Sequence, residues 1–134
     1  SCLAGISFLK GLGFVHAISH MVGAEFDTQH GLTNSIVLPA VLRFNKEVIN
    51  EKVPIICQSM GLKENSFNYL YQSICDLLDQ LNIPKNLKDI GVDETHIDRL
   101  AEKAMGDSAF ATNPRKASLS EMKKIIKHSI LNGR

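Results

Sequence analysis

The fold class is decided by the stretch FNYLYQSICDLLDQLNIP, residues 67–84. Its apolar side chains recur at spacings of three and four residues, which is the period of one face of an α-helix. We expect this helix to end at Ile83-Pro84, because proline cannot donate a backbone hydrogen bond. The spacing predicts a helix with one face toward a core, formed by Phe67, Leu70, Ile74, Leu77, Leu78 and Leu81.

The segments that follow and precede this stretch are also helical in pattern. Asp93 is a suitable cap for a helix over residues 94–105, and Ser118 with Glu121 forms a capping box before a last helix. Gly61 suits the left-handed residue that closes a helix over about 52–60.

The first third of the chain predicts three more helices, over residues 2–9, 14–24 and 31–45, with Pro39 bending the third. No convincing period-two alternation is present in the sequence, so the predicted fold class is all-α.

Charged side chains are unevenly distributed along the 134 residues. Residues 1–45 contain four of them, Lys10, Glu25, Asp27 and Arg43. We expect a single helical domain over 1–134, in which 1–45 form buried helices and 46–134 form amphipathic helices around them. Glu25 is expected to be a loop charge and Asp27 an exposed turn residue. The net charge of +1 gives no basic surface for nucleic acid.

The cysteines bear on the cellular compartment, and the interruptions of the apolar segment 2–24 bear on whether it spans a membrane. Cys2, Cys57 and Cys75 are odd in number and lack CxxC spacing, which predicts reduced, buried thiols in a cytoplasmic protein. Residues 2–24 are apolar, but Lys10, four glycines and two histidines interrupt them. We therefore expect no membrane span.

Three histidines lie in this apolar third. His16 and His20 are four residues apart, so they share one face of a helix. His30 is expected at the turn that opens the next helix, where a chain reversal can return it to the same cavity. This spacing permits a metal site, although a histidine on an apolar face is more often a hydrogen-bonded core residue. A zinc protease motif is excluded, because position 17 is Ala17 and lacks the glutamate that acts as general base.

The histidines belong to a longer pattern, which starts with GLGFVHAISH at residues 11–20. It continues with Gly23-Ala24, QHGLTN at 29–34 and Leu38-Pro39. This pattern closely resembles the signature of the iron-containing (group III) alcohol dehydrogenases. LNIPKNLKDIGVDE (81–94) is similar to the family segment after its long helix, and NPR (113–115) is similar to its closing motif. Met21 and Gln29 depart from the family, which often has proline at both positions.

The resemblance implies a role for each histidine. The family binds a divalent metal, mostly iron and sometimes zinc, through one aspartate and three histidines, and His16 and His30 match the last two of these. His20 matches a family histidine beside the nicotinamide and the substrate, which implies a catalytic and cofactor-binding residue. The metal would polarise the oxygen of a small alcohol or aldehyde during hydride transfer with NAD or NADP.

The resemblance also implies what the chain would need from elsewhere. In the family the nucleotide-binding domain and the other two metal ligands precede the matched segment. We therefore expect a C-terminal metal-binding helical domain that is inactive without the nucleotide-binding half and binds metal weakly alone. It is expected to associate with a second copy or with a complementary N-terminal chain. Two alternatives stay open: a non-catalytic interaction module derived from the family, and a small protein that binds metal through His16, His20, His30 and water.

Overall fold

The computed structural model describes residues 12–134, and these fold into helices without a β-strand, which confirms the all-α prediction. The helix expected over 2–9 and Cys2 lie outside the described residues. The α-helices are α2 (Gly13–Phe26), α3 (His30–Ile49), α4 (Val53–Ser59), α5 (Phe67–Gln80), α6 (Ile97–Met105) and α7 (Leu119–Leu131). Four short 3-10 helices join them: η1 (Asn50–Lys52), η2 (Leu87–Ile90), η3 (Glu94–His96) and η4 (Ser108–Thr112).

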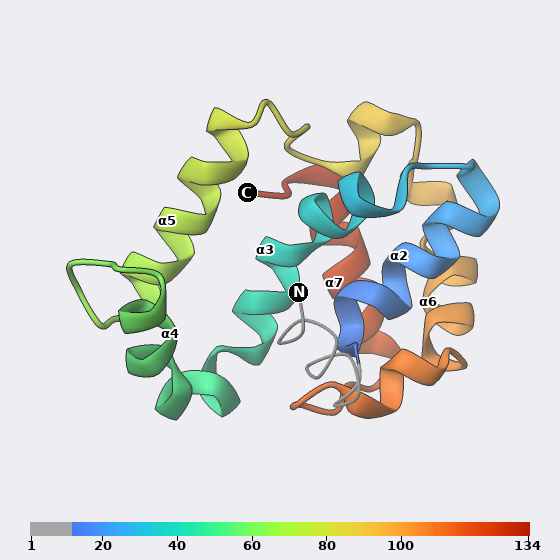
Figure 1. Cartoon of the computed structure of the whole chain (residues 1–134). Coiled ribbons are helices and arrows are strands. Elements are labelled where there is room, and N and C mark those ends of the chain that lie inside the picture. Colours follow the sequence, from blue (N-terminus) through green and yellow to red (C-terminus); the bar gives the residue numbers. More distant parts are fainter. Residues whose placement is uncertain (1–11) are drawn as a thin grey trace.

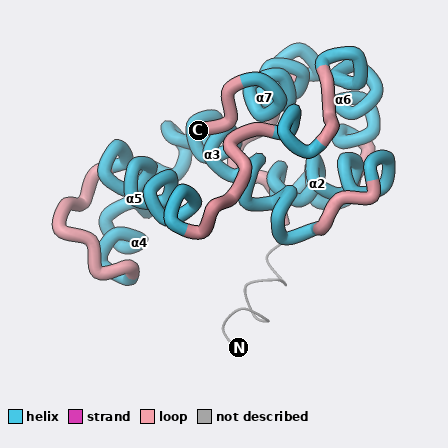
Figure 2. The backbone as a smooth tube through the Cα atoms, turned by 90° about the horizontal axis from the view of Figure 1, so that it is seen from above, coloured by secondary structure: helices cyan, strands magenta, loops and turns pink. Residues whose placement is uncertain are grey.

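Helix α3 connects two groups of helices (Figures 1 and 2). On one side, α2 packs against both α3 and α6, and α6 packs against α7. On the other side, α4 and α5 lie against the C-terminal part of α3 (Figure 1). The histidine-bearing helix α2 therefore belongs to the larger group, where it is held between α3 and α6.

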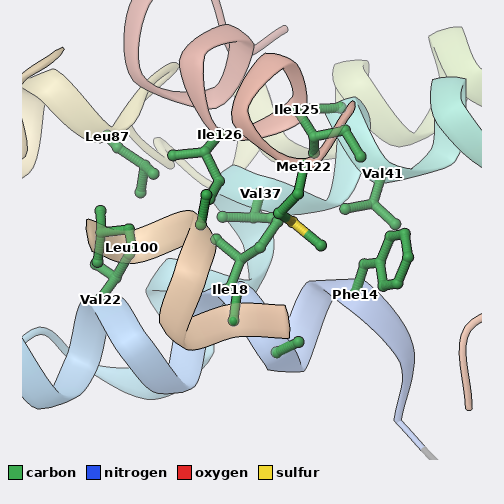
Figure 3. Close-up of a cluster of buried hydrophobic side chains, with 14 of the residues drawn as sticks. Phe14, Ile18, Val22, Val37, Val41, Leu87, Leu100, Met122, Ile125 and Ile126 are labelled. Carbon is green, nitrogen blue, oxygen red and sulfur yellow. The ribbon is translucent and has the colours of Figure 1, made fainter. Parts of the chain in front are cut away.

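The main core lies between α2, α3, α6 and α7 (Figure 3). Its side chains come from each of these helices at helical spacing, as the sequence periodicity predicts. A second cluster joins the end of α3 to α4 and α5 through Val53, Cys57, Phe67 and Leu70. Cys57 and Cys75 are free thiols and buried, as expected. Fully buried members of the main core include Phe14, Ile18, Val22, Ile36, Val37, Leu100, Met122, Ile126 and Ile130.

Several predicted helix ends are confirmed. Ser118 and Glu121 form the reciprocal capping box at the start of α7. Gly61 follows α4 with a φ of +69°, in the left-handed region that suits glycine. Asp93 caps a helical turn, but this turn is η3, which leads directly into α6. Helix α3 runs on through Pro39 and ends at Ile49, four residues later than predicted.

The predicted core face of α5 is wrong at its C-terminal end. The helix ends at Gln80, and Leu77 and Leu81 remain 49% and 60% exposed. Leu77 lies two turns beyond Leu70 on the same face, and the cluster formed with α4 does not reach that far. The spacing of the apolar residues therefore predicted the helix correctly. The predicted core face was too long, because the described residues do not cover the C-terminal turn of α5.

The last two residues dock against the segment that follows α5. Gly133 has a φ of +61°, and a Cβ atom there would lie only 1.5 Å from the Lys85 carbonyl oxygen. The Arg134 side chain, 3% exposed, donates to the Asp79 carboxylate and to the carbonyl oxygens of Ile83 and Pro84. This contact fixes the chain where α5 ends.

Glu25 is not the loop charge that we expected. It lies in the last turn of α2, and its carboxylate pairs with Lys103 and Arg99 of α6, each at 2.7 Å. Its side chain is only 11% exposed. Hydrogen bonds, first from Lys103 and then from Arg99, hold the pKa of the Glu25 carboxyl below its usual value. Glu25 thus fastens α2 to α6.

Within residues 12–134, no helix combines the length and the apolar character needed to cross a bilayer.

Candidate metal centre

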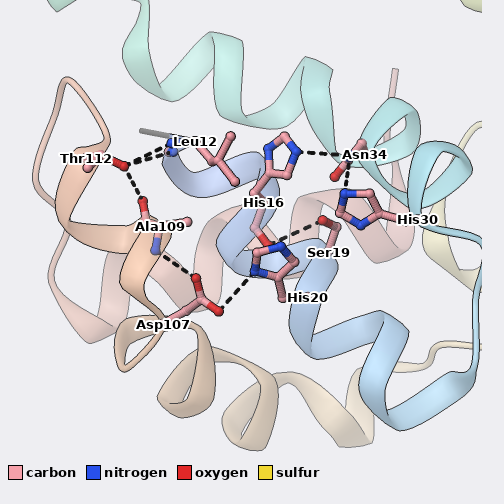
Figure 4. A network of polar contacts seen from close by, with 10 residues as sticks. Leu12, His16, Ser19, His20, His30, Asn34, Asp107, Ala109 and Thr112 are labelled. Atoms are coloured by element: carbon pink, nitrogen blue, oxygen red, sulfur yellow. Dashed lines mark hydrogen bonds and ion pairs between the residues drawn. The ribbon is translucent and has the colours of Figure 1, made fainter. Parts of the chain in front are cut away.

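Helices α2 and α3 bring three histidine side chains together (Figure 4). His16 and His20 lie one turn apart on α2, and His30 is the first residue of α3. The ring centroid of His16 is 5.8 Å from that of His20 and 5.2 Å from that of His30. The rings of His20 and His30 are stacked with their centroids 5.6 Å apart. The three side chains therefore share one site. The metal-binding role of His16 and His30 and the catalytic role of His20 stay predictions.

The turn between α2 and α3 produces this convergence. Asp27 ends α2 in the left-handed region with a φ of 51°, and its N–H donates to the Gly23 carbonyl oxygen. Asp27 is exposed, as expected for a turn residue. Gln29 then caps α3, because its side-chain oxygen accepts the Leu32 N–H. The residue that departs from the family's proline therefore satisfies one of the free N–H groups at the start of the helix.

Asn34 joins two of the imidazoles. Its side-chain Nδ2 lies 3.4 Å from His16 Nε2 and 3.1 Å from His30 Nε2. An amide nitrogen only donates hydrogen bonds, so an Nε2 atom that bonds to it does so through its lone pair, which is also the group that binds a metal. Two imidazole Nε2 atoms thus converge on one point.

The surroundings of His16 favour the chemical state that binds metals. Burial, and then the neighbouring rings of His30 and His20, lower the pKa of His16 below its usual value. The neutral imidazole, which is the form that coordinates cations, is therefore favoured. His16 Nδ1 is buried and has no hydrogen-bond partner among the described residues.

His20 has a different partner. Its Nδ1 lies 3.1 Å from Asp107 Oδ2, and the Asp107 side chain is 12% exposed. The other oxygen of Asp107 accepts the Ala109 N–H at 2.8 Å. Sequence reasoning missed both Asp107 and Asn34. Asn34 lies four residues after His30, a spacing that could have indicated it, whereas no local pattern connects Asp107 to His20.

The start of α2 is held by a segment far along the chain. Thr112 Oγ1 accepts the N–H groups of Leu12 and Gly13 at 3.1 and 3.2 Å. Asn113 Oδ1 accepts the Phe14 N–H at 3.2 Å, and Asn113 exchanges hydrogen bonds with the Asn45 amide of α3. These acceptors satisfy N–H groups that a helix start leaves without partners. The predicted closing motif, residues 113–115, therefore helps to position the histidine-bearing helix.

Comparison with known proteins identifies the family. The profile of the C-terminal part of the Fe-containing alcohol dehydrogenase family matches residues 1–130. The chain belongs to this family. An NADPH-dependent butanol dehydrogenase of Clostridium saccharobutylicum is 37% identical over 134 residues, which cover 93% of this chain and 34% of that protein. The lactaldehyde reductase of Escherichia coli K12 is 36% identical over 127 residues, covering 90% of this chain and 33% of that enzyme.

A solved structure agrees with the family assignment. The crystal structure of a 1,3-propanediol oxidoreductase matches with a TM-score of 0.84 and 33% identity, over 89% of this chain and 33% of that one. The chain spans about a third of the length of these relatives. It corresponds to the helical C-terminal portion of an iron-containing alcohol dehydrogenase.

The residues of this alcohol dehydrogenase portion fit part of a metal site. Across residues 12–134, no group of three histidine, cysteine, aspartate or glutamate side chains is placed to hold a metal ion. Two imidazoles do converge, at His16 and His30. The metal-ligand roles of His16 and His30, and the alternative that includes His20 and water, stay predictions.

Two histidines should make the stability of this domain depend on pH. Burial and then the nearby cation Arg43 lower the pKa of His128, as burial lowers that of His16. As the pH falls below about 6.5, the unfolded chain therefore takes up protons before the folded chain does. The free energy of unfolding should be highest above this pH and should decrease as the pH falls through the lower folded-state pKa values.

Urea unfolding at about pH 8 and about pH 6 measures this dependence on either side of the ordinary histidine pKa. The midpoint should fall at the lower pH, and the decrease should be smaller in His128→Gln. Equal midpoints at both pH values would contradict the prediction.

Proposed function

We propose that this chain is the metal-site portion of an NAD(P)-dependent alcohol dehydrogenase. One observation carries the proposal: the Nε2 atoms of His16 and His30 both face the same Asn34 nitrogen, at 3.4 and 3.1 Å. These are the two positions that the family pattern assigns to metal ligands. His20, in contact with both rings, occupies the position assigned to the reacting centre.

His16 and His30 would hold the metal, Fe²⁺ in the first instance and Zn²⁺ as a substitute, together with ligands from outside residues 12–134. When bound, the metal would act as a Lewis acid on an alcohol or carbonyl oxygen while a nicotinamide exchanges hydride with the substrate carbon. The partial burial of His16, and then the neighbouring rings of His30 and His20, lower its pKa and so favour the neutral ring that a metal can bind. His20 would bind and orient the substrate hydroxyl beside this centre.

The substrate class follows from the relatives. Proteins similar to this chain are named for butanol, lactaldehyde and 1,3-propanediol. A small alcohol or aldehyde is therefore the proposed substrate. The 134 residues would be inactive alone and would work with a nucleotide-binding portion, either in the same assembly or in a complementary chain. Free buried thiols at Cys57 and Cys75 favour a cytoplasmic location.

A chimera tests this proposal. The N-terminal portion of the Clostridium butanol dehydrogenase, which precedes the matched region, is joined to Ser1 of this chain. We expect the chimera to retain Fe²⁺ after dialysis and to reduce butanal with NADPH, whereas the 134-residue chain should retain less than one metal per molecule. His16→Ala in the chimera should lose the metal.

The His20→Ala substitution separates metal binding from catalysis. It should keep the metal but lower kcat by about 100-fold or more, which is the usual effect of removing a group that acts on the reacting atoms. His96→Gln is the matched control, since His96 pairs with Asp93 away from the cluster and should leave both metal content and kcat unchanged. A chimera that folds and binds metal but has no activity would contradict the proposal and favour the non-catalytic interaction module.

A further inference from the structure

We propose that Asp107 is a positioning residue that fixes the orientation and the tautomer of His20. Asp107 would keep the proton of the neutral ring on Nδ1 and leave the lone pair of Nε2 free on the side of His16 and His30. The catalytic importance of this pairing rests on the proposed function. The pairing itself does not, because it can be measured in the absence of metal and cofactor.

The contact between the two side chains defines the direction of the hydrogen bond. Asp107 Oδ2 lies 3.1 Å from His20 Nδ1. An ionised carboxylate only accepts hydrogen bonds, so Nδ1 must be the donor. In a neutral imidazole the other nitrogen is then the acceptor. Figure 4 shows that this second nitrogen faces away from Asp107, on the side where His16 and His30 lie.

The Asp107 carboxylate is itself held in place. Its Oδ1 accepts the Ala109 N–H at 2.8 Å, which caps the short helix η4. The same segment holds the start of α2 through Thr112 and Asn113. Both ends of the His20–Asp107 pair are therefore anchored, and the carboxylate cannot turn without losing the cap.

The hydrogen bond from the Ala109 N–H also determines how an asparagine side chain would be oriented at position 107. In Asp107→Asn the side-chain oxygen must still face the Ala109 N–H, because the NH₂ group cannot accept that bond. The NH₂ group then faces His20 Nδ1 and donates to it. Nδ1 becomes an acceptor, and the proton of the neutral ring moves to Nε2. The substitution thus keeps the size and the cap but reverses the direction of one hydrogen bond.

The consequence for catalysis is a change in what His20 offers the substrate. With the proton on Nδ1, Nε2 can accept a hydrogen bond from an alcohol hydroxyl. With the proton on Nε2, the same atom can only donate a hydrogen bond to the hydroxyl oxygen. It would then compete with the metal for the lone pairs of that oxygen. The amide variant of a histidine-orienting aspartate in the serine proteases lowers kcat through such a tautomer change.

Heteronuclear NMR of the ¹⁵N-labelled 134-residue chain tests the tautomer directly, at about pH 8.5, above the ordinary histidine range. In the parent chain, His20 Nδ1 should resonate as a protonated ring nitrogen and Nε2 as a non-protonated one. In Asp107→Asn the two should exchange. Thr112→Val is the matched control: it removes the one acceptor of the Leu12 and Gly13 N–H groups and should lower stability, but it should leave the His20 pattern unchanged.

An unchanged pattern in folded Asp107→Asn, or an Nε2–H tautomer in the parent chain, would overturn the proposal. In the chimera, Asp107→Asn should keep the metal and lower kcat by about 100-fold, as expected for a misoriented acid–base group. Full activity with an exchanged tautomer would also overturn it. If the parent chimera is inactive while the NMR result holds, the proposed function fails and the pairing stands.

Discussion

Asn34→Asp is expected to raise the affinity of the 134-residue chain for Zn²⁺ by at least about tenfold, or about 1.4 kcal/mol. The side-chain amide of Asn34 already reaches both Nε2 atoms of His16 and His30, at 3.4 and 3.1 Å. A carboxylate of the same size would place an anionic oxygen donor between the two imidazoles. Two histidines and one carboxylate form a donor set that zinc enzymes use.

Isothermal titration with Zn²⁺ at about pH 8 measures the change, above the ordinary histidine pKa. The matched control is the same substitution combined with His16→Ala, which should remove the gain because only one of the two imidazoles that face residue 34 remains. Equal affinity of Asn34→Asp and the parent chain would show that the two Nε2 atoms do not share a cation position.

Phe14→Ala is expected to lower the free energy of unfolding by about 3–5 kcal/mol, the usual cost of removing a buried aromatic ring. Phe14 is fully buried, and its ring centroid lies 5.0 Å from that of Phe110 and 5.7 Å from that of Phe44. It joins α2 to η4 and to α3. Since a domain is stable by only about 5–15 kcal/mol, this loss is a large fraction of the total.

Urea unfolding monitored by circular dichroism gives this difference. Leu77→Ala serves as the control, because Leu77 is an apolar side chain of α5 that is half exposed. It should change stability by no more than about 0.5 kcal/mol. A loss below about 1 kcal/mol in Phe14→Ala would show that the aromatic cluster is not part of the cooperative core.

The sequence predicted most helices because their signals are local. The capping pair Ser118 and Glu121 and the glycine after α4 act within a few residues, and both are confirmed. The exposure of Leu77 was not predictable, because it depends on how far the neighbouring helix extends. Glu25 was misjudged for the same reason: its partners Arg99 and Lys103 lie more than 70 residues away.

The candidate site was likewise predictable only in part from the sequence. The spacing of His16 and His20 and the turn before His30 permitted the three rings to meet, and the resemblance to the family turned this possibility into an expectation. The groups that orient them depend on tertiary structure, since Asp107 lies 87 residues from His20. A carboxylate in a glycine-containing loop between two helices carries no local mark of such a contact.

The segment of Thr112 and Asn113 completes the first turn of α2. The acceptors for the N–H groups of Leu12, Gly13 and Phe14 lie 99 or 100 residues later. A synthetic hairpin of residues 12–49 would contain all three histidines, yet it would lack these acceptors and the carboxylate beside His20. We therefore expect that the imidazole cluster cannot be transplanted as a short peptide, because its geometry depends on contacts with residues 107–113.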